Sequence, residues 1–227
     1  MTPLLVTAYT PSGFACSDPW SPSLDGLLAY WLLREQLGEE EFALGMSGQR
    51  PLVTPNDLPL ELVRHDDQWW WACSSPIVER HGEFLHYYHR RFDAMQAERF
   101  LLTGKSGRIL TRAGPYKAYR LVNRVVVTPQ VQWHCIGDEV EIRRLLRLCR
   151  FIGAGSTRGL GMVMRWEIRS EGANERLARY GRPLPVDYAH EHDIDGPLLE
   201  WGIRPPGRLL ENRCLCVMPG GEACELQ

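Results

Sequence analysis

The sequence contains very little lysine: two of its 26 basic residues are lysine, and the rest are arginine. It has no apolar run near the roughly twenty residues that a membrane-spanning helix requires, and its N-terminus lacks the pattern of a signal peptide. The seven cysteines have no regular spacing, which argues against the disulfide framework of a small secreted domain. We therefore expect a soluble cytoplasmic protein whose core is built from its 44% hydrophobic residues.

The net charge of −2 conceals a segregation of charge along the chain. Residues 80–169 hold 17 basic and 7 acidic residues, whereas residues 1–79 hold 3 against 11 and residues 170–227 hold 6 against 10. A basic central segment in an otherwise acidic chain is typical of a surface that faces nucleic acid. Arginine stacks on bases and grips phosphate in a fork, so its predominance agrees with that interpretation. A G+C-rich genome would give the same bias.

Residues 138–169 have the pattern of a helix, a glycine-rich loop and a strand. Asp138 and Glu141 have the spacing of an N-terminal capping box. The apolar side chains that follow recur at helical spacing and share one face; they are Ile142, Leu145, Leu146 and Cys149. Gly153 suits the left-handed position that ends a helix. It begins a run with four glycines, GAGSTRGLG, and residues 162–169 then alternate as a strand does.

This glycine-rich run matches neither of the two common phosphate-binding motifs. A Rossmann fingerprint requires a strand before the loop and a helix after it, and here the order is reversed. The lysine and serine pattern of a P-loop is also missing. Two interpretations remain: a loop whose bare backbone N–H groups lie against a sugar–phosphate chain, or a tight connection in which the glycines only supply positive φ.

The run resembles the glycine-rich loop of the RAMP superfamily of CRISPR-associated proteins, G-x-G-x-x-R-G-x-G, which lies between a helix and the last strand of a ferredoxin-like domain. The opening segment, with PLLVTAYTPSG, DPW and SLDGLLAYWLL, resembles the small capping subunit of type IV CRISPR effector complexes. The resemblance implies a ribonucleoprotein complex of antiviral defence. In that complex, such a subunit would hold the 5′ handle of the guide RNA and cap the backbone filament.

The expected fold is α+β. Strands and helices follow in the order β-α-β-β-α-β, which is that of a ferredoxin-like (RRM-type) domain with the glycine loop before its last strand. The expected elements are residues 4–10, 24–37, 68–73, 125–136 with a break at Pro129, 138–149 and 162–169. We expect this domain to span residues 1–169, with a basic arm inserted at about 77–124 and a loop at 39–67. Residues 170–227 would form a C-terminal extension that packs on the same domain.

RNA contacts are expected on the glycine loop and on the arm. Phosphates would lie on the loop, where Arg158 makes the charged contact and Ser156 and Thr157 supply hydroxyl donors. The arm resembles the thumb that folds over the guide RNA in relatives, and a solvated charged hairpin is the alternative. The expected RNA-binding residues are Arg90, Arg91, Lys105, Arg108, Arg112, Lys117, Gly153, Gly155, Ser156, Thr157, Arg158 and Gly159.

Two other functions fit the residues. A metal-independent endoribonuclease that processes CRISPR precursor RNA needs a general base and a general acid around the attacking 2′-hydroxyl. His86, Tyr87 and His89 are the candidates, beside the arginines of the arm. Type IV relatives have a separate processing subunit, so the resemblance implies a non-catalytic protein here. The other alternative is a protein-interaction module whose glycine loop is purely structural.

The expected partners are the guide (cr) RNA and the other subunits of the effector complex, namely the backbone subunit and the large subunit. The target DNA duplex is a further candidate because the protein would sit at the end of the filament. No membrane partner, cofactor or metal is expected. Cys214 and Cys216 with Cys224, and His190 with His192, do not have common ligand spacings.

Overall fold

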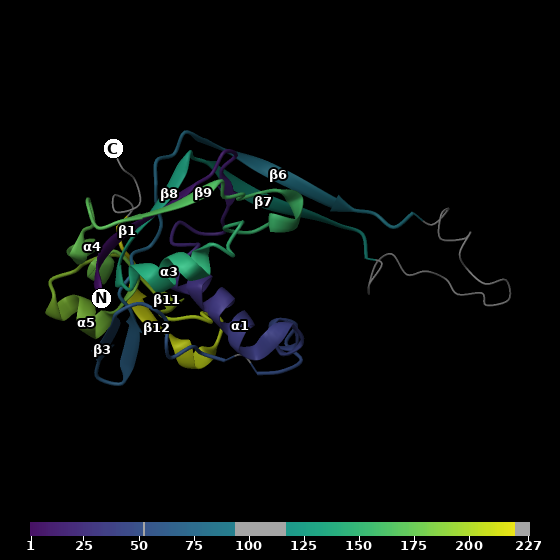
Figure 1. Cartoon of the computed structure of the whole chain (residues 1–227). Helices are drawn as coiled ribbons and strands as arrows, with labels where there is room; N and C mark the ends of the chain where they lie inside the picture. The colour runs from purple at the N-terminus through teal and green to yellow at the C-terminus, as the bar shows by residue number, and fades with distance from the viewer. Residues whose placement is uncertain (52, 94–116, 221–227) are drawn as a thin grey trace.

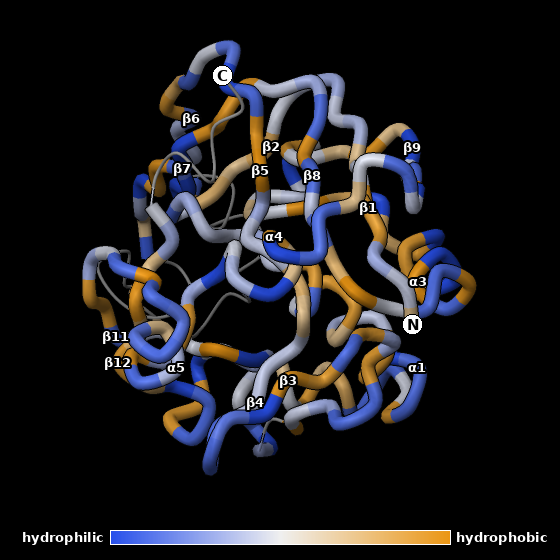
Figure 2. The backbone as a smooth tube through the Cα atoms, turned by 90° about the vertical axis from the view of Figure 1, so that its left-hand side faces the viewer, coloured by the Kyte–Doolittle hydropathy of each residue, from blue (hydrophilic) through white to orange (hydrophobic). Residues whose placement is uncertain are grey.

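The centre of the molecule is a four-stranded antiparallel sheet in the order β5-β8-β1-β9 (Figures 1 and 2). Its strands are β1 (Thr2–Tyr9), β5 (Ile77–Val78), β8 (Gln130–Gly137) and β9 (Arg165–Arg169). Val6 of β1 pairs with Trp133 on one side and with Ile168 on the other, which places three apolar side chains side by side on one face. This computed structural model describes residues 1–51, 53–93 and 117–220.

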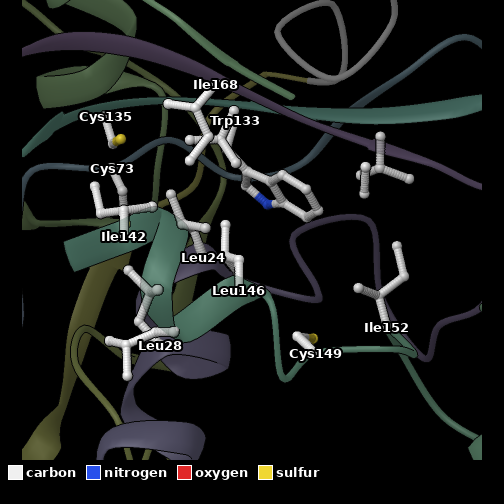
Figure 3. Close-up of a cluster of buried hydrophobic side chains, with 14 of the residues drawn as sticks. Leu24, Leu28, Cys73, Trp133, Cys135, Ile142, Leu146, Cys149, Ile152 and Ile168 are labelled. Atoms are coloured by element: carbon white, nitrogen blue, oxygen red, sulfur yellow. The ribbon is translucent and has the colours of Figure 1, made fainter. Parts of the chain in front are cut away.

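Two helices pack on the apolar face of the sheet, α1 (Leu24–Met46) and α3 (Glu139–Leu146). Figure 3 shows Leu28 and Leu24 of α1 facing Ile142 and Leu146 of α3, beneath Trp133 of β8. The expected stripe is confirmed for Ile142, Leu145 and Leu146, which are buried on α3. The expected end of this helix is wrong, because α3 ends at Leu146 and the buried Cys149 lies beyond it. The expected N-cap of α3 is present, because the Asp138 carboxylate accepts from the N–H groups of Val140 and Glu141. Ser23 caps α1 in the same way, its hydroxyl accepting from the N–H of Gly26.

The expected end of the first helix at Gly38 is confirmed as a break, because Gly38 has a φ of 75°. The expected loop over 39–67 is wrong in part. The chain turns helical again up to Met46, and Leu62–His65 forms the strand β3, which pairs with β4 (Gln68–Trp71). The second helical piece is held by Phe42, whose ring packs edge-on against Tyr30 at 4.9 Å.

A second apolar core lies below the central sheet and is built mainly by the C-terminal segment. Trp70 of β4 is fully buried there, with its ring 4.8 Å from that of Tyr188. Figure 2 shows α5, β11 and β12 grouped beside the β3–β4 hairpin. The C-terminal elements are α4 (Glu175–Tyr180), β10 (Leu184–Pro185), α5 (Val186–Glu191), β11 (Leu198–Gly202), the 3-10 turn η3 (Leu210–Asn212) and β12 (Arg213–Val217), with the sheet order β10-β12-β11.

The segment expected as a basic arm is bounded by two long strands. β6 (Gly82–Arg90) and β7 (Tyr119–Val127) form an antiparallel hairpin that extends away from the body of the molecule (Figure 1). β2 (Phe14–Ala15) adds a third strand beside β7. Lys105, Arg108 and Arg112, expected at the tip of the arm, lie outside the described residues.

The architecture is a mixture of α and β, with several antiparallel sheets and few helices. Within the described ranges, no helix combines the length and the apolar character needed to cross a membrane.

Candidate functional site

The glycine loop connects α3 to β9 and has a strongly left-handed backbone. All four of its glycines have positive φ, between 71° and 79°, a region that side chains with a Cβ enter only with strain. The loop also contains a 3-10 turn, η2 (Ser156–Arg158). The composition of the run therefore follows from its conformation.

Two of these glycines also allow a close backbone approach. A Cβ atom on Gly153 would lie 2.3 Å from the carbonyl oxygen of Ala15, and one on Gly161 would lie 1.9 Å from that of Ile152. The N–H of Ala154 donates to the Ala15 oxygen at 2.8 Å, so the loop is attached to β2. A purely structural role, as a tight connection, therefore explains why positions 153 and 161 are glycine.

The expected cradle of bare N–H groups is wrong for much of the loop. The N–H groups of Ala154, Arg158, Gly159 and Gly161 donate to backbone carbonyls of the protein. Such groups are not available to a phosphate. What the loop presents outward is the pair of exposed residues Ser156 and Thr157, with the half-buried Arg158 beside them.

The hairpin has two distinct faces because side chains alternate along a strand. One face, which we call the loop face, packs against the glycine loop through Val125, which forms a small buried cluster with Ala15 and Leu160. The register places eight residues on it: Phe84, His86, Tyr88, Arg90, Tyr119, Leu121, Asn123 and Val125. The opposite, outer face holds Glu83, Leu85, Tyr87, His89, Arg120, Val122, Arg124 and Val126.

On the loop face the glycine loop and the hairpin meet through a cation–π contact. The guanidinium of Arg158 lies over the ring of Tyr88, 4.1 Å from its centroid. Tyr119 lies 6.1 Å from Tyr88, and Arg90 lies over Tyr119 at 5.8 Å. We call Arg158, Tyr88, Tyr119 and Arg90 the basic–aromatic row. The structure thus brings together two expected arginines that are far apart in the sequence.

The tyrosines of this row were not among the expected RNA-binding residues. A signal for Tyr88 was present, because the alternation of EFLHYYHRRF puts it on the same face as Arg90. The expected residues Arg91 and Lys117 are both exposed near the end of the hairpin. Arg124 is less available, since its guanidinium donates to Glu83 and this hydrogen bond raises its pKa.

The three candidate nuclease residues do not converge. His86 lies on the loop face, whereas Tyr87 and His89 lie on the outer face. The ring of Tyr87 is covered by the guanidinium of Arg120 at 4.0 Å. A base and an acid that serve one phosphodiester must reach the same reacting group, and side chains on opposite faces of a strand do not.

In the described part of the chain, no three His, Cys, Asp or Glu side chains are grouped as metal ligands. The Sγ atoms of Cys214 and Cys216 lie 3.6 Å apart. Cys224 falls outside the residues that the structure describes.

Comparison with known proteins adds one family. The model of the family described as "CRISPR type IV associated protein Csf3" matches residues 12–219, which is most of the chain. No curated protein matches it.

Proposed function

The chain belongs to the Csf3 family of type IV CRISPR-associated proteins, and from this premise we propose that it is a non-catalytic subunit that binds the guide (cr) RNA. In this proposal it grips the 5′ handle and caps one end of the backbone filament. Its neighbours there are the backbone subunit and the large subunit, and the target DNA duplex is a further partner at the filament end.

The observation that supports this proposal best is the contact of Arg158 with Tyr88. It joins the glycine loop to the hairpin and continues into Tyr119 and Arg90. Two neighbouring aromatic rings flanked by guanidinium groups suit single-stranded RNA, because rings stack on bases and arginines contact phosphates. Base–aromatic stacking contributes about 1–3 kcal/mol per base. Ser156 and Thr157 add hydroxyl donors at the end of the row.

The proposal includes a ferredoxin-like (RRM-type) RAMP domain over residues 1–169, with residues 170–227 as an extension on it. The strand order β5-β8-β1-β9 supports this, since it places the first and third strands of a β-α-β-β-α-β series in the centre. The two helices that follow β1 and β8 both lie on one face of the sheet. The glycine loop then leads into the edge strand β9.

In the same proposal the arm clamps the RNA. Arg91 and Lys117 are exposed where the hairpin leaves the described part of the chain. Lys105, Arg108 and Arg112 follow in the sequence between them. Each phosphate contact of these cations releases counterions, so the logarithm of the RNA affinity should fall linearly with the logarithm of the salt concentration.

The test mixes purified protein with a labelled guide-RNA precursor in the absence of added metal. Binding is followed across a salt series, and RNA length on a denaturing gel. We expect intact RNA, salt-dependent binding, and a loss of affinity in Arg158→Ala. Arg176→Ala is the matched control, because Arg176 is exposed on α4 and lies outside the basic segment.

Each rival function gives a different result. A shortened product that disappears in His86→Ala or His89→Ala would establish the nuclease. RNA binding that is the same in Arg158→Ala and in the control would reject the glycine loop as an RNA site. Absence of binding at every salt concentration would favour the protein-interaction module.

A further inference from the structure

A cavity of about 810 Å³ lies between α1 and the C-terminal segment at residues 201–208, which includes the end of β11. It is separate from the proposed RNA site, because no residue of the basic–aromatic row lines it. Its size is that of a binding pocket. The proposed RNA binding does not involve this cavity, so the residues that line it require a separate functional explanation.

The wall of the cavity exposes large apolar side chains. Tyr30, Leu37, Met46 and Val53 line it and keep 40%, 39%, 47% and 47% of their surface accessible. An exposed apolar group of this kind is unfavourable in water and marks a contact surface. Trp20, Phe42 and Trp201 also line the cavity, so its wall offers both aliphatic and aromatic surface against which apolar side chains can pack.

The floor of the cavity is polar, buried and fixed. Arg182 donates to Asp25 at 3.2 Å and to the carbonyl oxygen of Ile203 at 2.6 Å. These bonds join α1 to the C-terminal segment beneath the cavity. Two atoms of the floor, Nε of Arg182 and Oγ of Ser75, are buried without a hydrogen-bond partner in the described structure. A floor held in this way is preorganised, which reduces the ordering cost of binding.

The rim of the cavity has an excess of positive charge. Arg50 is paired with Glu41. Arg204, by contrast, donates to the carbonyl oxygens of Trp69 and Glu211, and no carboxylate among the described residues pairs with it. Arg208 is exposed and also has no ion pair in that part of the chain. An occupant with a carboxylate would complement this rim.

We propose that the cavity is the docking site for a segment of another protein subunit of the complex, one with apolar side chains flanked by an acidic residue. The apolar side chains fill the space between Leu37, Met46 and Val53, and the acidic residue faces Arg204 and Arg208. The inference relies on membership of a multi-subunit complex and is independent of the RNA proposal.

The first experiment identifies the occupant. The photo-crosslinker p-benzoylphenylalanine replaces Leu37, the chain is co-expressed with the other subunits and guide RNA, and the assembled complex is irradiated. We expect the crosslinker to form an adduct with one peptide of another subunit. Mass spectrometry should identify this peptide by its sequence, which should contain apolar side chains flanked by an acidic residue. The matched control replaces Val140, which is 73% exposed on α3. An adduct with RNA, no adduct, or an equal adduct at position 140 would overturn the proposal.

The second experiment measures incorporation into the complex. Leu37→Asp and Arg208→Glu should each lower co-purification with the other subunits at least tenfold, whereas Val140→Asp should leave it unchanged. Both targeted side chains are exposed, so circular dichroism should show a native fold. RNA binding by the isolated variants should equal that of the wild type, and this separates the cavity from the RNA site. Normal incorporation of folded Leu37→Asp and Arg208→Glu would contradict the inference.

Discussion

The guanidinium of Arg158 lies 4.1 Å from the ring centroid of Tyr88, so the single arginine of the glycine loop packs on β6, the first long strand of the arm. The glycines of the loop and the alternation of side chains along β6 together place these two side chains next to each other. Gly153 lets the loop approach Ala15 closely, and the loop face of the hairpin packs on Leu160 beside it. A loop and an arm that would each be a weak RNA site alone are thereby presented together.

The first prediction concerns the ring of Tyr88. Tyr88→Phe keeps the aromatic face, so RNA affinity should stay within about a factor of two of wild type. Tyr88→Leu removes a cation–π contact worth about 0.5–1 kcal/mol at an exposed site and a stacking surface for a base. Affinity should fall about tenfold if one base stacks there. Fluorescence anisotropy at fixed salt measures both variants, and equal loss in both would reject the role of the ring.

The second prediction concerns the glycines of the loop. Gly161→Ala should destabilise the protein strongly, because its Cβ would lie 1.9 Å from the Ile152 oxygen at a φ of 72°. Gly159 has a similar φ of 78° but open space around the added atom, so Gly159→Ala should cost only about 1 kcal/mol of left-handed strain. Urea denaturation of the two variants compares the costs. Equal costs would mean that backbone conformation alone, and not close packing, requires glycine.

Local patterns predicted the elements on which the site is built. The cap at Asp138 and the apolar stripe of α3 depend on residues close in sequence, and so does the alternation of β6. The tyrosines of the row could have been placed on one face from that alternation. The contact of Arg158 with Tyr88 could not, because the packing of Leu160 on Val125 decides which hairpin face meets the loop.

Long-range packing decides what the local patterns leave open. Alternation along residues 68–73 places Trp70 on the opposite face from Trp69 and Trp71, but it does not tell which face is buried. Trp70 is fully buried, because the C-terminal segment builds a second core around it. Asp25 lies in the first turn of α1, where a carboxylate is favoured by the helix dipole. Its buried partner Arg182 follows 157 residues later, so no local pattern points to the pair.

The third prediction concerns this buried ion pair. Asp25→Asn leaves the guanidinium of Arg182 buried without its counter-charge, which should cost about 3–5 kcal/mol of unfolding free energy. Glu83→Gln is the matched acid-to-amide control, because Glu83 pairs with Arg124 on the exposed outer face of the hairpin and such pairs contribute about 0–1 kcal/mol. Replacing both members of the buried pair, as Asp25→Leu with Arg182→Met, should cost less than Asp25→Asn alone. Chemical denaturation gives all three values, and a small effect of Asp25→Asn would show that the pair contributes little.

The fourth prediction concerns acid stability and His134. This side chain is buried, its Nδ1 accepts the N–H of Asn174 at 3.1 Å, and burial lowers the pKa of His134 below the ordinary 6.5. The unfolded chain therefore binds a proton near pH 6.5 that the folded protein binds only at lower pH. Stability from this group is fully present above pH 6.5 and is lost as the pH falls toward the folded pKa, by up to about 1.4 kcal/mol per pH unit.

The free energy of unfolding should be measured at pH 7.5, 6.5 and 5.5. His134→Asn keeps an acceptor near the position of Nδ1 and should lose less stability over this range than wild type. His190→Asn, an exposed control on α5, should retain the wild-type pH dependence. An unchanged pH dependence in His134→Asn would assign the acid sensitivity to other groups.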